Sequence, residues 1–291
     1  MKKPFALALS LLIPCLPSSG MAALPQTETQ QIDHDPFGVW QSKPRDFQQI
    51  TRRGAKVVYM PEEQTFFTYW IPPHYKSGRI VVSVHGTGGN PYIAMRDEIS
   101  DAEKFDYLPV AISWFSRERG FFQAQDLYRN ILEALNFIHS KFGNDLSAVA
   151  YIGFSRGSAV SYEVAHLDTV SENIFDLFIS HSGGIPMDLR VEARNPDSKP
   201  DAFFSQLVNG KLGNEVFKGK KFFLYSGDKD ESCGLTMSLQ MEHAKQLIES
   251  NDGQVLEWVR DPNGGHRGLL QNPATKEKAL RYFIDLTPRP S

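Results

Sequence analysis

Short apolar segments alternate along most of the chain with longer segments in which apolar residues recur at helical spacing. Six apolar segments predict strands, at residues 79–86, 107–115, 146–154, 174–184, 220–228 and 254–261. Four segments of helical period predict helices, at residues 121–143, 157–167, 235–250 and 273–286. This alternation is typical of βαβ units, and strands that are apolar throughout indicate a sheet covered on both faces. The sequence therefore predicts an α/β fold with a mostly parallel central sheet between two layers of helices.

An antiparallel pair of strands is predicted ahead of this series. Residues 56–60 and 65–71 are rich in β-branched and aromatic residues, and only the polar turn "PEEQ" separates them. No linker interrupts the chain from residue 55 on, so residues 55–291 are expected to form one domain. Within it, residues 185–219 predict a short excursion over an edge of the sheet rather than a full lid. Residues 23–54 are polar and broken by prolines, and predict an extended or loosely packed lead-in.

The first 22 residues have the pattern of a secretory signal peptide. Lys2 and Lys3 precede an apolar run over residues 5–16, and small residues up to Ala22 follow. The apolar run is too short to span a bilayer. We therefore expect cleavage after Ala22 and a periplasmic or secreted mature protein.

The composition of the mature chain disfavours several classes of function. Loss of Lys2 and Lys3 changes the formal charge from −3 to −5, and no basic run is present, so nucleic-acid binding is not expected. No later stretch is apolar enough for a membrane span. Cys233 is the only cysteine left after cleavage, so no internal disulfide is expected. The sequence does not indicate an oligomeric state.

A serine between two glycines occurs where a predicted strand meets a predicted helix. In "YIGFSRGSAV" (151–160), Gly153, Ser155 and Gly157 form a G-x-S-x-G motif. The glycines permit a sharp turn, and the helix N-terminus brings backbone N–H groups toward the serine oxygen. Because short motifs also occur by chance, a nucleophile requires an oxyanion loop upstream and an acid and a histidine downstream.

The glycine-rich loop "VSVHGTGGN" follows an earlier predicted strand and suits an oxyanion hole. We expect one backbone N–H from Arg156 and a second from Thr87 or Gly88. A phosphate or dinucleotide loop is disfavoured because Pro91 follows the glycines and no G-K-[ST] is present. His85 precedes the serine, so it is expected to be structural rather than the base.

Two histidines lie downstream of the acidic candidates, where the base of this motif is expected. His243 falls inside the predicted helix 235–250, which is typical of a helix-surface residue. His266 lies in the glycine turn "DPNGGHRG" after strand 254–261, at the carboxyl end of the predicted sheet. His266 is therefore the predicted base.

The acid is expected just past the strand at 220–228, where Asp228, Asp230 and Glu231 lie. Asp228 directly follows a glycine and suits the tight turn itself. Asp230 is two residues farther out, where a carboxylate can reach the histidine ring. Asp230 is the preferred acid and Asp228 the second choice.

The segments "SVHGTGG", "GFSRGS", "SHSGGIP", "SGDKDES" and "GGH" together resemble α/β-hydrolases, and within them the small serine esterases of the phospholipase/carboxylesterase and dienelactone-hydrolase-like groups. The resemblance covers residues 55–286. It implies the α/β-hydrolase fold, a triad of Ser155, Asp230 and His266, and Thr87 as the second oxyanion donor. In those groups the acid ends a G-x-x-D pattern, which here ends on Asp230.

Together with the signal-peptide pattern of residues 1–22, the resemblance implies an exported serine hydrolase that cleaves small-molecule or polymer-borne carboxylic esters through an acyl-enzyme on Ser155. No cofactor or metal is expected, because the triad supplies nucleophile and base, and H-E-x-x-H and C-x-x-C motifs are absent from the sequence. The same residues could serve a peptidase or thioesterase. A binding protein on a hydrolase scaffold is the alternative outside enzymes.

Aromatic residues at strand ends are candidates for the walls of a substrate pocket. Tyr92, Trp114 and Phe115 have this placement, although each is also compatible with the core. Arg117 and Arg119 could meet an acidic substrate group or be solvated charges.

Overall fold

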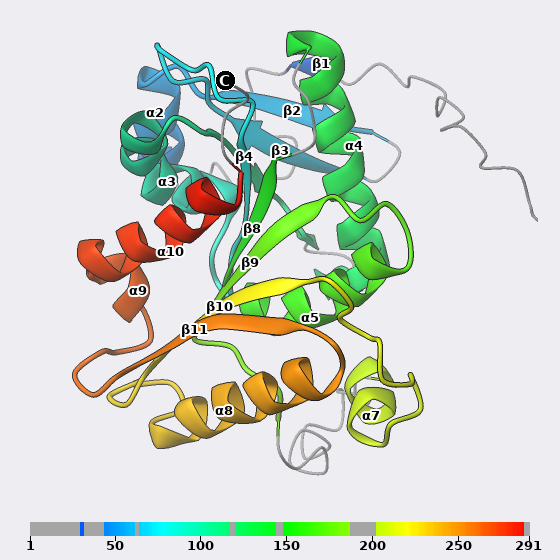
Figure 1. The fold of residues 1–291 in the computed structure, drawn as a ribbon. Helices are drawn as coiled ribbons and strands as arrows, with labels where there is room; N and C mark the ends of the chain where they lie inside the picture. Colours follow the sequence, from blue (N-terminus) through cyan, green and yellow to red (C-terminus); the bar gives the residue numbers. More distant parts are fainter. Residues whose placement is uncertain are drawn as a thin grey trace, which may run out of the picture.

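The computed structural model describes residues 30–31, 44–61, 64–116, 120–143, 148–186 and 202–287. Its main strands are β1 (Gln30–Gln31), β2 (Lys56–Met60), β3 (Thr65–Tyr69), β4 (Ile80–Val84), β5 (Leu108–Ile112), β8 (Val149–Phe154), β9 (Phe175–His181), β10 (Lys221–Gly227) and β11 (Gln254–Asp261). Within the described residues these form one nine-stranded sheet, in the order β1-β2-β3-β5-β4-β8-β9-β10-β11 (Figure 1). The strands from β5 to β11 in this order pair in parallel, whereas β1, β2 and β3 pair antiparallel.

Helices cover both faces of this sheet (Figure 1). They are α2 (Pro44–Arg52), α3 (Pro91–Phe105), α4 (Ala124–Phe142), α5 (Arg156–Thr169), α7 (Ala202–Val208), α8 (Leu235–Ser250), α9 (Gly268–Gln271) and α10 (Pro273–Leu286). One buried cluster joins α4, α5, α7 and α8 to the sheet, and the other joins α2, α3, α9 and α10 to it. Neighbouring strand residues alternate between the clusters, as Val81 and Val82 of β4 do, because successive side chains of a strand point to opposite faces.

The predicted mostly parallel sheet with helices on both faces is confirmed. The predicted antiparallel pair is also confirmed, since β2 pairs with β3 and Val58 lies opposite Phe67. The predicted bounds 235–250, 254–261 and 273–286 coincide with α8, β11 and α10. These elements have strong local signals of period or composition.

The prediction of an extended or loosely packed lead-in is wrong for residues 44–52, which form α2. Phe47 and Ile50 of this helix are buried, and the Phe47 ring packs edge-on against Tyr92 at 5.3 Å between centroids. These two side chains lie one helical turn apart, so they anchor the helix on α3. Too few apolar residues occur in this segment to reveal the period in the sequence.

Part of the predicted organisation lies outside the described residues, namely the signal peptide 1–22, residues 23–29 and 32–43 of the lead-in, and residues 187–201 of the excursion. Residues 202–219 include α7, whose Phe203, Phe204 and Leu207 are buried against the core. No helix in the described part of the chain is long and apolar enough to cross a membrane.

The second, small sheet is a hairpin of β6 (Phe115–Ser116) and β7 (Gly120–Phe121) that follows β5. The loops after β4, β8, β10 and β11 all leave the carboxyl ends of neighbouring parallel strands. In open α/β sheets this edge is the usual position of ligand sites. It carries all three residues of the predicted triad.

Candidate active site

Ser155 lies at the turn between β8 and α5, in a backbone conformation rare for a residue with a side chain. Its φ is 54° and its ψ is −117°. Such strain persists only where the surroundings impose it, and it is concentrated at functional sites. Here the Ser155 N–H donates to the His181 carbonyl at 2.9 Å, and the Ser155 carbonyl accepts from Ser158 and Ala159 at the start of α5. The turn is therefore fixed on both sides.

Glycines surround this turn because backbone approaches it too closely for side chains. A Cβ on Gly157 would lie 2.2 Å from the Val84 carbonyl oxygen. A Cβ on Gly183 would lie 2.0 Å from the Ser155 carbonyl oxygen, and one on Gly153 would lie 2.4 Å from that of Gly157. The G-x-S-x-G spacing thus has a steric cause: β4, β9 and α5 meet tightly around the serine.

The three predicted triad residues form one hydrogen-bonded series. His266 Nε2 lies 2.9 Å from Ser155 Oγ, and His266 Nδ1 lies 2.7 Å from Asp230 Oδ2. The second oxygen of Asp230 accepts from the backbone N–H groups of Ser232 at 2.8 Å and Cys233 at 3.0 Å. The Asp230 side chain is fully buried, and the His266 side chain is 15% exposed. The carboxylate is thereby held in position to orient the imidazole toward the hydroxyl.

The second acidic candidate, Asp228, has other partners. Its carboxylate accepts from Arg260 Nε at 2.8 Å and from Ser238 Oγ at 2.7 Å, and these bonds lower the pKa of Asp228. Glu231 accepts from the backbone N–H of His266 at 2.9 Å, which lowers the pKa of Glu231. Asp230 therefore contacts the ring of His266, whereas Glu231 holds its backbone.

The predicted oxyanion loop lies beside the serine. A Cβ on Gly86 would lie 2.7 Å from the Ser155 Cβ, so the chain segment carrying Thr87 passes next to the turn. Thr87 itself is exposed, and Gly88 follows with a φ of 72°. Arg156 begins α5 directly after Ser155, and its guanidinium lies 4.4 Å from the centre of the Phe121 ring. Backbone N–H groups from two segments are thus available near one side chain.

Two of the three predicted pocket walls are core residues. Tyr92 is fully buried on α3 and packs against Phe66 at 5.5 Å, so its prediction as a pocket wall is wrong. Trp114 is 2% exposed and donates from Nε1 to the His85 carbonyl, so it too belongs to the core. Phe115 is 42% exposed on the hairpin and remains a candidate wall. Arg117 and Arg119 lie outside the described residues.

The other histidines considered in the sequence are placed away from the triad. His243 of α8 has Nδ1 3.2 Å from the Ile185 carbonyl. His85 is buried, and its Nδ1 lies 2.9 Å from the Gly86 carbonyl. Burial lowers the pKa of His85 to about 4, which keeps the ring neutral at pH 7.

The buried His85 is expected to make stability depend on pH. Its pKa is about 4 in the folded chain and ordinarily 6.5, so the unfolded chain binds more protons between these values and stability falls as pH falls through this window. The loss is on the order of 3 kcal/mol by pH 4. We expect His85→Asn to flatten the free energy of unfolding between pH 6.5 and 4.5, measured by urea denaturation. Equal pH slopes for both proteins would contradict the burial of a neutral ring.

The rings of Phe154 and His181 lie beside the triad, and the sequence did not predict a role for either residue. The Phe154 ring lies 5.0 Å from that of His266 and stacks on that of His181 at 4.9 Å. Arg267 lies over the same ring at 5.5 Å. Phe154 thus connects the triad histidine to a second, buried histidine.

The similarity of this chain to known proteins lies in its fold. No family model matches the chain, and no curated protein matches it. Solved structures do match. An esterase of Pyrobaculum calidifontis has 13% identity and a TM-score of 0.63, over 88% of this chain and 93% of that one. A fungal esterase of Rhizomucor miehei has 16% identity and a TM-score of 0.62, over 87% and 90%.

A third solved structure is a larger protein. The acylaminoacyl peptidase of Pyrococcus horikoshii has 14% identity and a TM-score of 0.54, over 77% of this chain and 40% of that one. Likeness at such identities establishes the fold alone, and it confirms the predicted α/β-hydrolase fold.

Proposed function

We propose that this chain is an exported serine hydrolase that cleaves carboxylic esters through an acyl-enzyme on Ser155. The observation that carries the proposal is the series Asp230–His266–Ser155, with contacts of 2.7 and 2.9 Å at a strained strand-to-helix turn. Unrelated folds use this arrangement to activate a hydroxyl as a nucleophile. The solved structures with the same fold include proteins named as esterases, which supports this substrate class.

In the first half-reaction, Ser155 Oγ attacks the ester carbonyl carbon while His266 Nε2 takes the hydroxyl proton. The negative charge on the carbonyl oxygen is stabilised by the N–H groups of Arg156 and Thr87. Asp230 holds the imidazole in the required tautomer and stabilises the imidazolium without taking its proton. The C–O bond then breaks, His266 protonates the leaving alcohol, and the acyl group remains on Ser155.

In the second half-reaction, water replaces the alcohol. His266 takes a proton from the water, whose oxygen attacks the acyl carbon. The second tetrahedral intermediate uses the same N–H groups, and it releases the carboxylic acid as His266 returns a proton to Ser155. Every step uses only substrate, water, the three triad side chains and these two backbone N–H groups.

The export part of the proposal rests on residues 1–22, which lie outside the described residues. Expression in a Gram-negative host is expected to yield a periplasmic or secreted protein that begins at Ala23. Intact mass measurement of the fractionated protein tests this. An uncleaved chain in the cytoplasm would contradict export.

Separate substitution of Asp230 and Asp228 by asparagine tests which of the two is the acid of the triad. Asp230→Asn is expected to lower kcat about 10³- to 10⁴-fold, because the amide favours the wrong histidine tautomer. Asp228→Asn is expected to keep kcat within about fivefold, since its partners are Arg260 and Ser238 rather than His266. Steady-state kinetics on a 4-nitrophenyl ester measure both. A larger loss in Asp228→Asn would reassign the acid.

A substrate panel with one acyl group tests the reaction class. We expect the mature protein to hydrolyse 4-nitrophenyl butanoate with a higher kcat/KM than the butanoyl thioester or the butanoyl 4-nitroanilide. A higher kcat/KM for the thioester or the anilide would favour the thioesterase or peptidase alternative. Absence of hydrolysis of all three by folded protein would favour the binding-protein alternative.

A further inference from the structure

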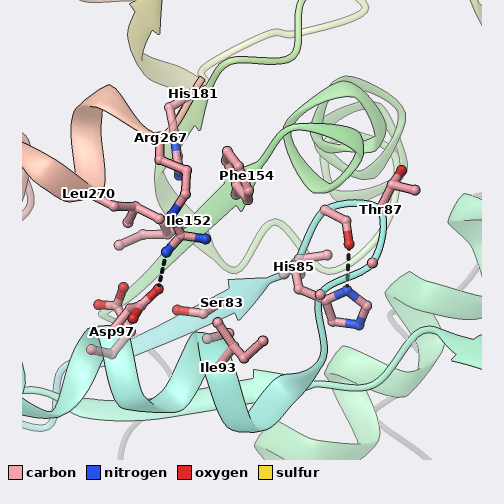
Figure 2. A pocket seen from close by; sticks show the side chains of 16 residues that line it. Ser83, His85, Thr87, Ile93, Asp97, Ile152, Phe154, His181, Arg267 and Leu270 are labelled. Carbon is pink, nitrogen blue, oxygen red and sulfur yellow. Dashed lines mark hydrogen bonds and ion pairs between the residues drawn. The ribbon is translucent and has the colours of Figure 1, made fainter. Parts of the chain in front are cut away.

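A cavity of about 150 Å³ lies at the carboxyl ends of β4, β8 and β9, on the face of the sheet covered by α3 (Figure 2). We call it the inner cavity. Ser83, Phe154 and His181 contribute to it from the strands. The lining also includes residues of α3, the loop 85–89, Arg267 directly before α9, and Leu270 of α9. Ser155 and His266 are not among the lining residues, so the inner cavity is distinct from the triad.

The inner cavity nevertheless borders the reaction centre. Gly86 lines it, and a Cβ on Gly86 would lie 2.7 Å from the Ser155 Cβ. Phe154, which also lines it, has its ring 5.0 Å from the His266 ring. Thr87, a proposed oxyanion donor, belongs to the same lining. The inner cavity therefore lies directly beside the nucleophile and the base.

Polar groups without partners lie at the inner cavity. His181 is fully buried and Ser83 is 4% exposed. Neither ring nitrogen of His181 nor the Ser83 hydroxyl has a hydrogen-bond partner among the described residues. Burial, followed by the positive charge of Lys276, holds the pKa of His181 well below its usual value, so the ring is neutral. A neutral imidazole supplies one donor and one acceptor, and the hydroxyl supplies both.

Such an arrangement destabilises the fold unless another molecule completes it. Buried polar groups in proteins are almost always hydrogen-bonded, and leaving one unpaired costs more than the bond itself contributes. A phenylalanine at position 181 and an alanine at position 83 would remove this cost. The presence of both polar side chains beside a cavity therefore points to an occupant with its own donors and acceptors.

The charges around the inner cavity are already paired. Arg267 donates to Asp97 at 2.8 Å, the contact dashed in Figure 2, and Lys276 donates to Glu98 at 3.0 Å. Ile93 and Leu270 add apolar lining. Because these charges already pair with one another, they offer no counter-charge to a charged ligand. An uncharged polar group would fit the lining.

We propose that the inner cavity binds an uncharged, hydroxyl-bearing part of the ester substrate, with Ser83 and His181 as its hydrogen-bond partners. This inference rests on the proposed esterase function and specifies its substrate class. The cavity volume corresponds to about five waters at ~30 Å³ each, which sets the scale for a short hydroxylated carbon chain. The hydroxyl can belong to the acyl or to the alcohol part of the ester.

Matched ester pairs test the inference and distinguish the two sources. The acyl pair is 4-nitrophenyl butanoate and 4-nitrophenyl 3-hydroxybutanoate, and the alcohol pair is propyl butanoate and 3-hydroxypropyl butanoate. In one of the two pairs, the wild-type enzyme is expected to have a kcat/KM about tenfold higher for the hydroxylated ester than for the ester without the hydroxyl. Ser83→Ala and His181→Phe are each expected to reduce this ratio toward one. Because both values of kcat/KM in this ratio come from the same enzyme variant, a loss of activity that affects both esters equally cancels.

Thr68→Val is the matched control. The Thr68 hydroxyl is also buried without a partner among the described residues, and Thr68 and Ser83 pair with Ala111 from opposite sides. Thr68 does not line the inner cavity, so Thr68→Val is expected to keep the wild-type ratio. His181→Phe is expected to fold with an equal or higher Tm, because it removes two unpaired polar atoms.

The outcomes separate the inference from the function on which it rests. Equal kcat/KM within every pair, in an active enzyme, would overturn the inference and leave the esterase function standing. A preference that survives in both variants would also overturn it and would indicate that the hydroxyl is recognised outside the inner cavity. Absence of hydrolysis of every ester would overturn the proposed function and this inference together.

Discussion

Ser155→Ala is expected to lower kcat for ester hydrolysis by at least about 10³-fold while the fold is retained. Alanine removes the attacking oxygen, and among the described residues no other hydroxyl is hydrogen-bonded to His266. His266→Ala is expected to cause a loss of similar size, because Ser155 then lacks a base. Circular dichroism and the Tm of each variant check that the loss is chemical.

The double variant Ser155→Ala/His266→Ala tests whether the two residues act together in catalysis. Residues that act as one unit lose their effect together, so the double variant is expected to be no slower than the worse single variant. His243→Ala is the matched control, since this ring contacts the Ile185 carbonyl rather than the triad, and its kcat is expected to stay within about twofold. Multiplicative losses in the double variant would contradict a coupled pair.

Lys220→Met is expected to lower the free energy of unfolding by about 3–5 kcal/mol. Lys220 Nζ forms an ion pair with Asp168, and both side chains are fully buried. Asp168 also accepts from Tyr128 Oη at 2.8 Å and from the backbone N–H of Ile174 at 2.9 Å. Removal of the ammonium leaves a buried carboxylate without its counter-charge, which costs far more than the pair contributes.

Two further variants separate charge from packing at this pair. Lys220→Met/Asp168→Asn is expected to be more stable than Lys220→Met alone, because the unpaired charge is gone. Lys218→Met removes an exposed lysine paired with Glu215 at 2.9 Å, and its urea midpoint is expected to stay near wild type. Equal shifts for Lys218→Met and Lys220→Met would contradict the buried pair.

Much of the fold could be predicted because its signals are local. The helical period of α8 and α10, and the β-branched and aromatic residues of β11, set the bounds of these elements without tertiary information. α3 was not predicted, although Asn90 and Pro91 form a helix start, with the Asn90 side chain accepting from the Ile93 N–H. Its buried face includes Glu98, which interrupts the apolar period and is satisfied only by distant partners.

The candidate triad could be predicted because each member follows a strand in a fixed order, and parallel strands bring their carboxyl ends together. The choice between Asp230 and Asp228 as the acid depends on the conformation of the loop, which the spacing in the sequence does not determine. The pocket walls could not be predicted. Tyr92 and Trp114 have the composition of walls, but both point into the core, and only tertiary packing decides this. The sequence likewise does not predict that the His181 ring lies buried without a hydrogen-bond partner among the described residues.

The most direct measurement is activity-based labelling of the mature protein with a fluorophosphonate, followed by peptide mass mapping. We expect one covalent adduct on Ser155, absent in Ser155→Ala and formed much more slowly in His266→Ala. A folded sample that forms no adduct, or forms it on another serine, would contradict the assignment of Ser155 as an activated nucleophile.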